Sequence, residues 1–321
     1  MKTQIKQVHF QITRNCNLRC PFCGQWGKKG FFADSSGEAM SIEDWKRIIS
    51  ELESYGNRMG EMPTVTVWGG EPLVSPYFDE ILTLLNEKGF RTEVITNGVL
   101  INEHSEVIKN CVRRLYVSLD GPQSVHDAIR GEGVFGTVKA NLKALNHPCV
   151  TIMSVITPGL VSSLPQFLTE LKEFNIKELY LQDMIGLSRD EIEEYKKWMK
   201  DAFDISATDI NSWENNELKV FNDEVDRHLD TNYGYRIEHK THTSDCSMVC
   251  KSAYNHPHIA WNGNVLYCTD FYDFSAGNVK TDTLENIFNN EKSERYRSEI
   301  ADGKCPSCNH CSWRTRDIWN I

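Results

Sequence analysis

The chain has 321 residues, 40% of them hydrophobic and 25% charged, and a formal net charge of −10. Its excess of acidic residues disfavours a nucleic-acid backbone as a partner. No apolar run approaches the roughly 18 residues of a membrane span, and the N-terminus MKTQIKQVHF lacks the apolar core of a signal peptide, so we expect a cytoplasmic protein without membrane attachment.

Residues 7 to about 185 alternate short β-branched or aromatic runs with longer helical patterns, which predicts βα units and a parallel sheet. One helix is expected to begin after Ser41, with Asp44 in its first turn, and to end at Gly56. Six strands are predicted, at 8–13, 64–68, 91–96, 114–119, 150–156 and 178–183. The predicted fold class is therefore α/β, as an open sheet or a partial (β/α)6 barrel.

Chemically conspicuous residues follow the first four of these strands. Cys16 follows the first strand, the GGEP stretch at 69–72 the second and the TNG stretch at 96–98 the third, and Ser118 lies at the end of the fourth. Since the carboxyl ends of parallel strands share one mouth, we expect these residues to meet there. Further along, residues 188–232 read as charged helices that pack against the rest of the protein.

Eleven cysteines in a chain without an export signal favour metal or redox chemistry over disulfides. Three of them, Cys16, Cys20 and Cys23, form the pattern C-x3-C-x2-C. A zinc site would need a fourth ligand, for which His9 is a candidate. A [4Fe–4S] cluster held by three thiolates would instead leave one iron open to substrate or cofactor.

This loop resembles the hallmark of the radical S-adenosylmethionine (radical SAM) enzymes, including the aromatic residue, Phe22, before the last cysteine. The resemblance implies that the open iron chelates the amino and carboxylate groups of S-adenosylmethionine (SAM). It further implies reductive cleavage of SAM to methionine and a 5′-deoxyadenosyl radical, which abstracts hydrogen from substrate. An electron donor such as flavodoxin or ferredoxin is then a required partner.

The resemblance extends to the SAM contacts. GGEP looks like the family motif that binds the methionine amino group, where glycines let the backbone approach the ligand; without the family it is only a turn after a strand. The stretch SLDGPQSVHDAIRG (118–131) is similar to one that contacts the ribose and the methionine carboxylate. The cofactor contacts so implied are Phe22, Gly69, Gly70, Glu71, Thr96, Asn97, Ser118 and Arg130. Asp120, His126 and Asp127 are expected to shape the turn and cap the next helix.

Six cysteines follow residue 245, and four of them could form a zinc site. The spacing C-x9–15-G-x4-C, from Cys250 through Gly263 to Cys268, resembles the C-terminal extension called SPASM, or twitch in its shorter form. The chain lacks the later cysteines of the long form, so we expect one auxiliary [4Fe–4S] cluster. Its expected ligands are Cys250, Cys268, Cys305 and Cys308, with Cys311 or Cys246 as substitutes.

The predicted domains are a radical SAM partial-barrel core at 1–187, a helical connecting segment at 188–245 and a SPASM/twitch-like domain at 246–321. Oxidative radical chemistry needs a base, and carboxylates facing the mouth are the candidates. Asp183 ends the sixth predicted strand and Asp270 lies two residues after Cys268.

Members with this extension often act as oxidoreductases or maturases of peptides and proteins, by crosslinking, epimerisation or oxidation. The alternative is a dehydrogenase or related enzyme acting on a small molecule such as a sugar or aminocyclitol. Because the first strand begins at about residue 7, we expect no fused leader-binding domain, and a separate leader-peptide-binding protein becomes a candidate partner. Two other classes stay open: a zinc-stabilised binding module and an electron-transfer protein.

Overall fold

The computed structural model describes residues 3–26, 38–183, 187–208, 219–229, 231–240, 250, 252–269, 271–306 and 308. Its central feature is one sheet with the strand order β10-β9-β8-β1-β2-β3-β4-β5-β6-β7. Each neighbouring pair from β1 to β7 is parallel. These strands are β1 (Gln7–Gln11), β2 (Thr64–Trp68), β3 (Thr92–Thr96), β4 (Arg114–Ser118), β5 (Val150–Val155), β6 (Glu178–Gln182) and β7 (Arg236–Lys240).

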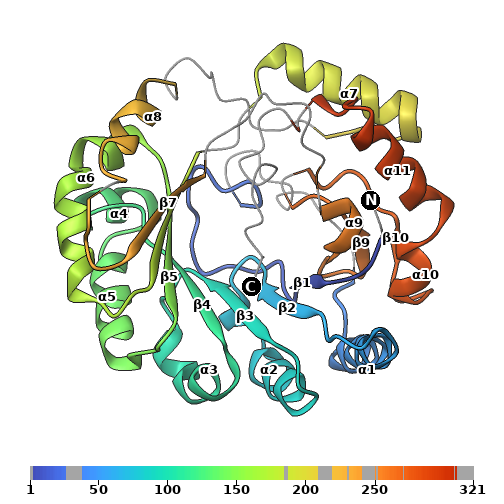
Figure 1. The fold of residues 1–321 in the computed structure, drawn as a ribbon, viewed down its shortest axis with the longest axis horizontal. Coiled ribbons are helices and arrows are strands. Elements are labelled where there is room, and N and C mark those ends of the chain that lie inside the picture. Colours follow the sequence, from blue (N-terminus) through green and yellow to red (C-terminus); the bar gives the residue numbers. More distant parts are fainter. Residues whose placement is uncertain are drawn as a thin grey trace.

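The sheet curves around the centre of the molecule and its helices lie on the outer side (Figure 1). The outer helices are α1 (Ile42–Met59), α2 (Phe78–Glu87), α3 (Ser105–Cys111), α4 (Gln123–Arg130), α5 (Val134–Leu145) and α6 (Pro158–Glu170). Short 3-10 helices are η1 (Pro72–Val74), η2 (Ile101–His104) and η3 (Leu171–Glu173). The predicted α/β barrel-type architecture is confirmed. None of the helices that the structure describes is long and apolar enough to cross a membrane.

Two local expectations need correction. Helix α1 has the predicted capping box between Ser41 and Asp44, but it continues past Gly56 to Met59 and ends at Gly60, whose φ is 77°. Only the second glycine adopts the left-handed conformation that ends a helix. The segment expected to be helical also contains β7, whose sequence RIEHK has no apolar run because it is an edge strand.

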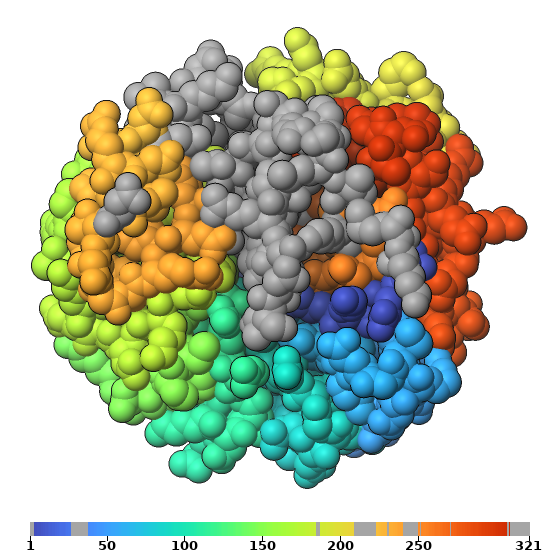
Figure 2. Space-filling model, viewed as in Figure 1, coloured from blue at the N-terminus to red at the C-terminus, as the bar shows by residue number. Residues whose placement is uncertain are grey.

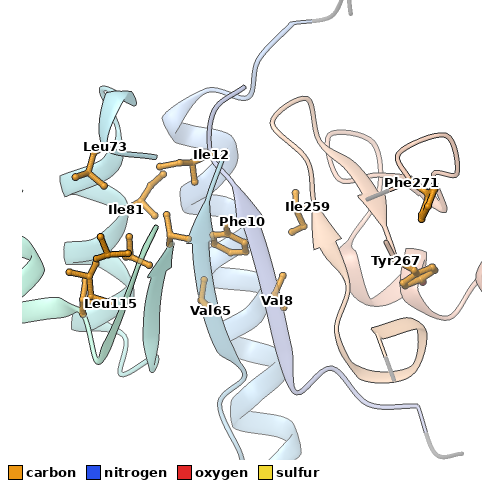
Figure 3. Close-up of a cluster of buried hydrophobic side chains, with 14 of the residues drawn as sticks. Val8, Phe10, Ile12, Val65, Leu73, Ile81, Leu115, Ile259, Tyr267 and Phe271 are labelled. Atoms are coloured by element: carbon orange, nitrogen blue, oxygen red, sulfur yellow. The ribbon is translucent and has the colours of Figure 1, made fainter. Parts of the chain in front are cut away.

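Side chains alternate between the two faces of the strands. The outward set, which includes Val8, Phe10 and Val65, packs into one hydrophobic core with the helices (Figure 3). The other set is largely polar or aromatic. Its members are linked to one another, as where the Gln7 amide donates to Thr66 Oγ1 at 2.9 Å. The inner face of the sheet can therefore present polar groups to a ligand.

The C-terminal part continues the same sheet. It comprises α7 (Arg189–Phe203), α8 (Lys219–Asp226), α9 (Ser252–Asn255), β8 (His258–Ile259), β9 (Asn264–Leu266), β10 (Gly277–Asn278), α10 (Leu284–Phe288) and α11 (Glu291–Ala301). Strand β8 pairs with β1 in parallel, and β9 and β10 follow antiparallel. Ile259 lies beside Val8 and Phe10 (Figure 3). Figure 2 shows the C-terminal elements, in orange and red, against the blue N-terminal ones.

Candidate functional site

The loop that follows β1 carries the three-cysteine motif. Cys20 is buried and Cys16 and Cys23 are half-buried. Backbone N–H groups point at two of the sulfurs: Leu18 donates to Cys16 Sγ and Trp26 donates to Cys23 Sγ, each at 3.4 Å. Such N–H···S contacts favour thiolates and tune the clusters that thiolates hold.

The loop is anchored on the backbone that follows β2. Gly70 N–H donates to Thr13 O at 2.9 Å and Glu71 N–H donates to Asn15 O at 2.8 Å. A Cβ on Gly70 would lie 2.3 Å from Asn15 O, and one on Gly69 would lie 2.5 Å from Thr13 O. In this structure the two glycines are therefore required by the close approach of the chain's own loops, rather than by approach to a ligand alone.

The carboxylate of Glu71 holds three loops together. It is buried and accepts hydrogen bonds from Leu73 N–H at 3.1 Å, Thr96 Oγ1 at 2.7 Å and Asn97 N–H at 2.7 Å. Burial raises the pKa of Glu71 to about 7, although these hydrogen bonds oppose the rise. The Asn97 amide donates in turn to Asn17 Oδ1 at 2.7 Å in the cysteine loop. Thr96 thus positions Glu71, while Asn97 reaches the cysteine loop directly.

Arg130, at the end of α4, is a largely buried cation near the motif. Its Nε donates to Asp120 Oδ2 at 2.5 Å, and Asp120 Oδ1 accepts from Val155 N–H at 3.1 Å. The guanidinium lies 6.0 Å from the centre of the Phe22 ring. Burial raises the pKa of Cys20 and the charge of Arg130 opposes that rise, so Arg130 favours the thiolate.

The turn before α4 is fixed by its own polar residues. The Asp120 N–H donates to His126 Nδ1 at 3.1 Å, and Asp127 accepts from Gly133 N–H and Phe135 N–H at 3.1 and 2.8 Å. Of the expected roles, Asp120 and His126 shape the turn, and Asp127 receives N–H groups at the start of the next helix, α5. Ser118, the last residue of β4, is half-buried, and its role as a ribose contact stays a prediction.

The motif cysteines suit an iron–sulfur cluster. Burial raises the pKa of Cys16 to about 11, so its thiolate needs a bound cation to persist. Three thiolates carried by one loop, two of them facing backbone N–H donors, fit such a cluster.

Four C-terminal cysteines gather around one tyrosine. Burial raises the pKa of Tyr296, and four neighbouring thiols raise it further: those of Cys268, Cys305, Cys308 and Cys250. The four cysteines therefore lie near the Tyr296 hydroxyl. Cys308 N–H donates to Cys305 O at 3.2 Å. Cys246 and Cys311 lie outside the described residues.

Helix α7 covers this cysteine cluster with aromatic side chains. Trp198 lies 6.3 Å from Tyr296, ring centre to ring centre, and its Nε1 donates to Glu299 at 3.2 Å. Tyr195 donates its hydroxyl to Asp273 at 3.0 Å. The charged segment therefore packs on the C-terminal elements, as its sequence predicts.

Of the two residues proposed as bases, the structure describes Asp183 but not Asp270. Asp183 is buried and lies 3.3 Å from His239 Nε2, while His239 Nδ1 lies 2.8 Å from Asp226 Oδ1 on α8. Burial alone would lower the pKa of His239, but the two carboxylates outweigh it and raise the pKa. Asp183 and His239 are thus the buried members of a hydrogen-bonded triad that ends at the exposed Asp226, and the catalytic role of Asp183 stays a prediction. Asp270 lies outside the described residues.

Sequence reasoning missed one cluster. His9, His256 and His258 come together because β1 pairs with β8. The sequence offers His9 only as a ligand for the cysteine loop, and His256 and His258 as structural residues. The His-Pro-His stretch could have suggested a metal site. However, nothing in the sequence shows that β8 pairs with β1 in the register that places this stretch opposite His9.

Comparison with known proteins agrees with this geometry. Residues 10–161 match the radical SAM superfamily, and residues 250–312 match SPASM, an iron–sulfur cluster-binding domain. The chain belongs to the radical SAM superfamily and carries a C-terminal SPASM domain. The cofactors of that family and domain are SAM, a [4Fe–4S] cluster and auxiliary iron–sulfur clusters.

The similar proteins have different named roles. The antilisterial bacteriocin subtilosin biosynthesis protein AlbA of Bacillus subtilis is 27% identical over 94% of this chain, which spans 65% of AlbA. The Fe-coproporphyrin III synthase of Methanosarcina barkeri is 25% identical over 95% of the chain and 80% of the enzyme. Among solved structures, Streptococcus suis SuiB bound to its precursor peptide SuiA aligns with a TM-score of 0.66 and 17% identity, over 97% of this chain and 71% of SuiB.

Proposed function

We propose that the protein is a radical SAM enzyme that modifies a peptide or protein. Cys16, Cys20 and Cys23 would hold a [4Fe–4S] cluster, which supplies the electron that cleaves SAM to methionine and a hydrogen-abstracting 5′-deoxyadenosyl radical. The observation that carries this proposal is the arrangement of the cysteine loop. It is fixed between Asn97 on one side and Arg130 on the other, at the carboxyl ends of β1, β3 and β4.

The residues around the loop have distinct proposed roles. Arg130 would pair with the methionine carboxylate, because a guanidinium has further N–H donors besides the Nε that holds Asp120. Asn97 already touches the cysteine loop and would contact the cofactor beside it. Glu71 and Thr96 would act mainly as positioning residues, since each is hydrogen-bonded within the protein.

Peptide or protein modification is supported by two of the similar proteins. AlbA takes part in the biosynthesis of the bacteriocin subtilosin, and SuiB binds a precursor peptide. The auxiliary cluster, held by Cys250, Cys268, Cys305 and Cys308, would relay electrons, with flavodoxin or ferredoxin as the external partner. A leader-binding protein would present the peptide. The second candidate, a small-molecule substrate, is favoured by the similarity to Fe-coproporphyrin III synthase over 95% of the chain.

Release of 5′-deoxyadenosine tests the reaction class. Anaerobically reconstituted protein with SAM and dithionite should release it, and Cys20→Ala should abolish the release. Cys111→Ala is the matched control, since Cys111 is half-buried on α3 and belongs to neither cysteine set. Equal release by the parent and Cys20→Ala would refute the proposal.

Deuterium transfer tests the substrate class. Candidate precursor peptides deuterated at their side chains and α-carbons are compared with a deuterated porphyrin-type substrate from which Fe-coproporphyrin III is made. Deuterium in 5′-deoxyadenosine identifies the molecule from which hydrogen is abstracted. Transfer from the porphyrin and from none of the peptides would replace peptide modification by the second candidate.

A further inference from the structure

Three histidines form a compact cluster where the first strand meets the C-terminal strands. His9 of β1 is opposite His258 of β8, and the His9 N–H donates to Pro257 O at 3.1 Å. The His9 ring centre lies 4.2 Å from that of His256 and 4.6 Å from that of His258. One ring nitrogen from each histidine lies within 4.8 Å of the other two.

All three imidazoles are buried, which disfavours their charged form. Each histidine is only 6% exposed. Burial lowers the pKa of His9 and His256 well below the ordinary value and lowers that of His258 to about 3. The proximity of the rings lowers the pKa of His9 and His256 further. A cluster that resists protonation keeps its lone pairs available for a cation.

One histidine is held with its tautomer fixed. Ser252 Oγ lies 3.1 Å from His258 Nε2, 2.8 Å from Tyr267 O and 3.0 Å from His256 O. Both carbonyls only accept, so these contacts are best satisfied when the hydroxyl donates to a carbonyl and His258 Nε2–H donates to Oγ. His258 Nδ1 therefore carries a lone pair.

That lone pair is buried and has no hydrogen-bond partner among the described residues. A ring nitrogen left bare while its counterpart donates to an outer group is the arrangement of a metal-ligating histidine. A buried nitrogen whose lone pair accepts no hydrogen bond destabilises the folded state, and a ligand bound at His258 Nδ1 would remove this cost.

We propose that His9, His256 and His258 bind a divalent transition-metal ion with an affinity for imidazole, represented by Zn²⁺. Three neutral imidazoles are a known zinc donor set, and zinc–nitrogen bonds of about 2.0 Å would place the nitrogens about 3.3 Å apart, a short inward movement from their present spacing. The ion would join β1 of the barrel to β8 of the C-terminal part. This site is separate from both cysteine sets and does not depend on the proposed function.

Zinc content and zinc X-ray absorption test the site in the protein with its iron–sulfur clusters loaded, so that the cysteines are occupied. After incubation with Zn²⁺ and desalting, about one zinc per chain is expected. Its X-ray absorption should show imidazole nitrogens at about 2.0 Å and no sulfur near 2.3 Å. Zinc at background level, or zinc with sulfur ligands, would overturn the proposal without any variant being needed.

Substitutions then assign the ligands. His258→Gln and His9→Gln should each lose at least nine-tenths of the zinc while iron and sulfide stay unchanged. The matched control is His104→Gln, since His104 is partly buried in η2 and contacts Asp79 instead. Unchanged zinc in both ligand variants would also overturn the proposal. Should a variant lose iron together with zinc, the absorption spectrum of the parent decides.

Discussion

Gly70 shows how a single residue fixes the geometry of the cysteine loop. Its N–H and that of Glu71 donate to carbonyls of the loop, and this contact leaves no room for a side chain. The atoms that a Cβ on Gly70 would meet belong to the backbone of the cysteine loop, which cannot move aside as a flexible side chain would. The cluster site therefore depends on a glycine that need not touch the cluster.

We expect Gly70→Ala to lower the free energy of unfolding by about 2 kcal/mol, as overpacking does, and to reduce the iron held by the motif. Denaturant titration and iron analysis measure the two effects. The control is Gly136→Ala, since a Cβ on that exposed position in α5 meets nothing within 4 Å. Equal effects of the two substitutions would show that the loop contact is unimportant.

Glu93 lies on the inner face of the sheet, and through it we expect the stability of the protein to depend on pH. Burial raises its pKa to about 7, with Arg114 and hydrogen bonds from Thr66 and Tyr116 opposing the rise. The unfolded chain has the ordinary value of 4.5. Between these values the folded state binds the proton more tightly, so the stability that Glu93 contributes is present below pH 4.5 and is lost as the pH rises to 7.

Glu93→Gln should therefore flatten the fall in stability between pH 5 and pH 7 by about 1.4 kcal/mol per pH unit. Denaturant titrations of parent and variant at pH 5, 6 and 7 measure the difference. Glu103→Gln, at an exposed position of η2, should leave the profile unchanged. Parallel pH profiles for the parent and Glu93→Gln would contradict the assignment.

At the scale of elements, α7 forms one wall of the auxiliary cysteine cluster. Its Tyr195, Trp198 and Met199 are buried and its Lys197 and Lys200 are exposed, which is the amphipathic pattern of a helix that covers a core. The Trp198 ring also meets Phe203 edge to face at 5.4 Å. The packing of α7 therefore affects the surroundings of the four C-terminal cysteines.

Trp198→Ala should lower the free energy of unfolding by about 3 kcal/mol, because it leaves a cavity beside Tyr296. It should also lower the iron content from about eight to about four per chain, as expected when one of two [4Fe–4S] clusters is lost. Lys197→Ala on the exposed side of the same helix is the control. Full iron in Trp198→Ala would show that α7 does not support the auxiliary site.

At the scale of the whole molecule, the barrel and the C-terminal elements share a sheet and a hydrophobic core. The junction is the pairing of β1 with β8, where Ile259 is fully buried. Surface contacts across the junction also exist, such as the ion pair between Arg58 of α1 and Glu285 of α10, but both side chains are about half exposed. Burial rather than surface charge should hold the two parts together.

Ile259→Ala should lower the free energy of unfolding by about 3 kcal/mol, with the barrel and the C-terminal elements still unfolding together. Arg58→Ala should cost less than about 1 kcal/mol. Circular dichroism and cluster absorbance, followed through the same anaerobic denaturant titration, measure both. Two separate transitions in the parent protein would contradict a shared core.

Features that depend on short-range patterns could be predicted from the amino-acid sequence. The alternation of apolar runs predicted the parallel sheet from β1 to β6, and the spacing of Cys16, Cys20 and Cys23 predicted the loop because one tight segment carries all three. The capping residues Ser41 and Asp127 were likewise readable, since a cap acts within a few residues.

Features that depend on contacts between distant segments became visible in the folded chain. The tertiary structure added β7, whose charged sequence is tolerated at a sheet edge, and it joined β8 to β1. That pairing brings His9 next to His258, 249 positions away along the chain. It also showed that Glu71 and Gly70 serve the packing of loops against one another. Strand register and loop contacts arise from the packing of the whole chain, so no local pattern of residues encodes them.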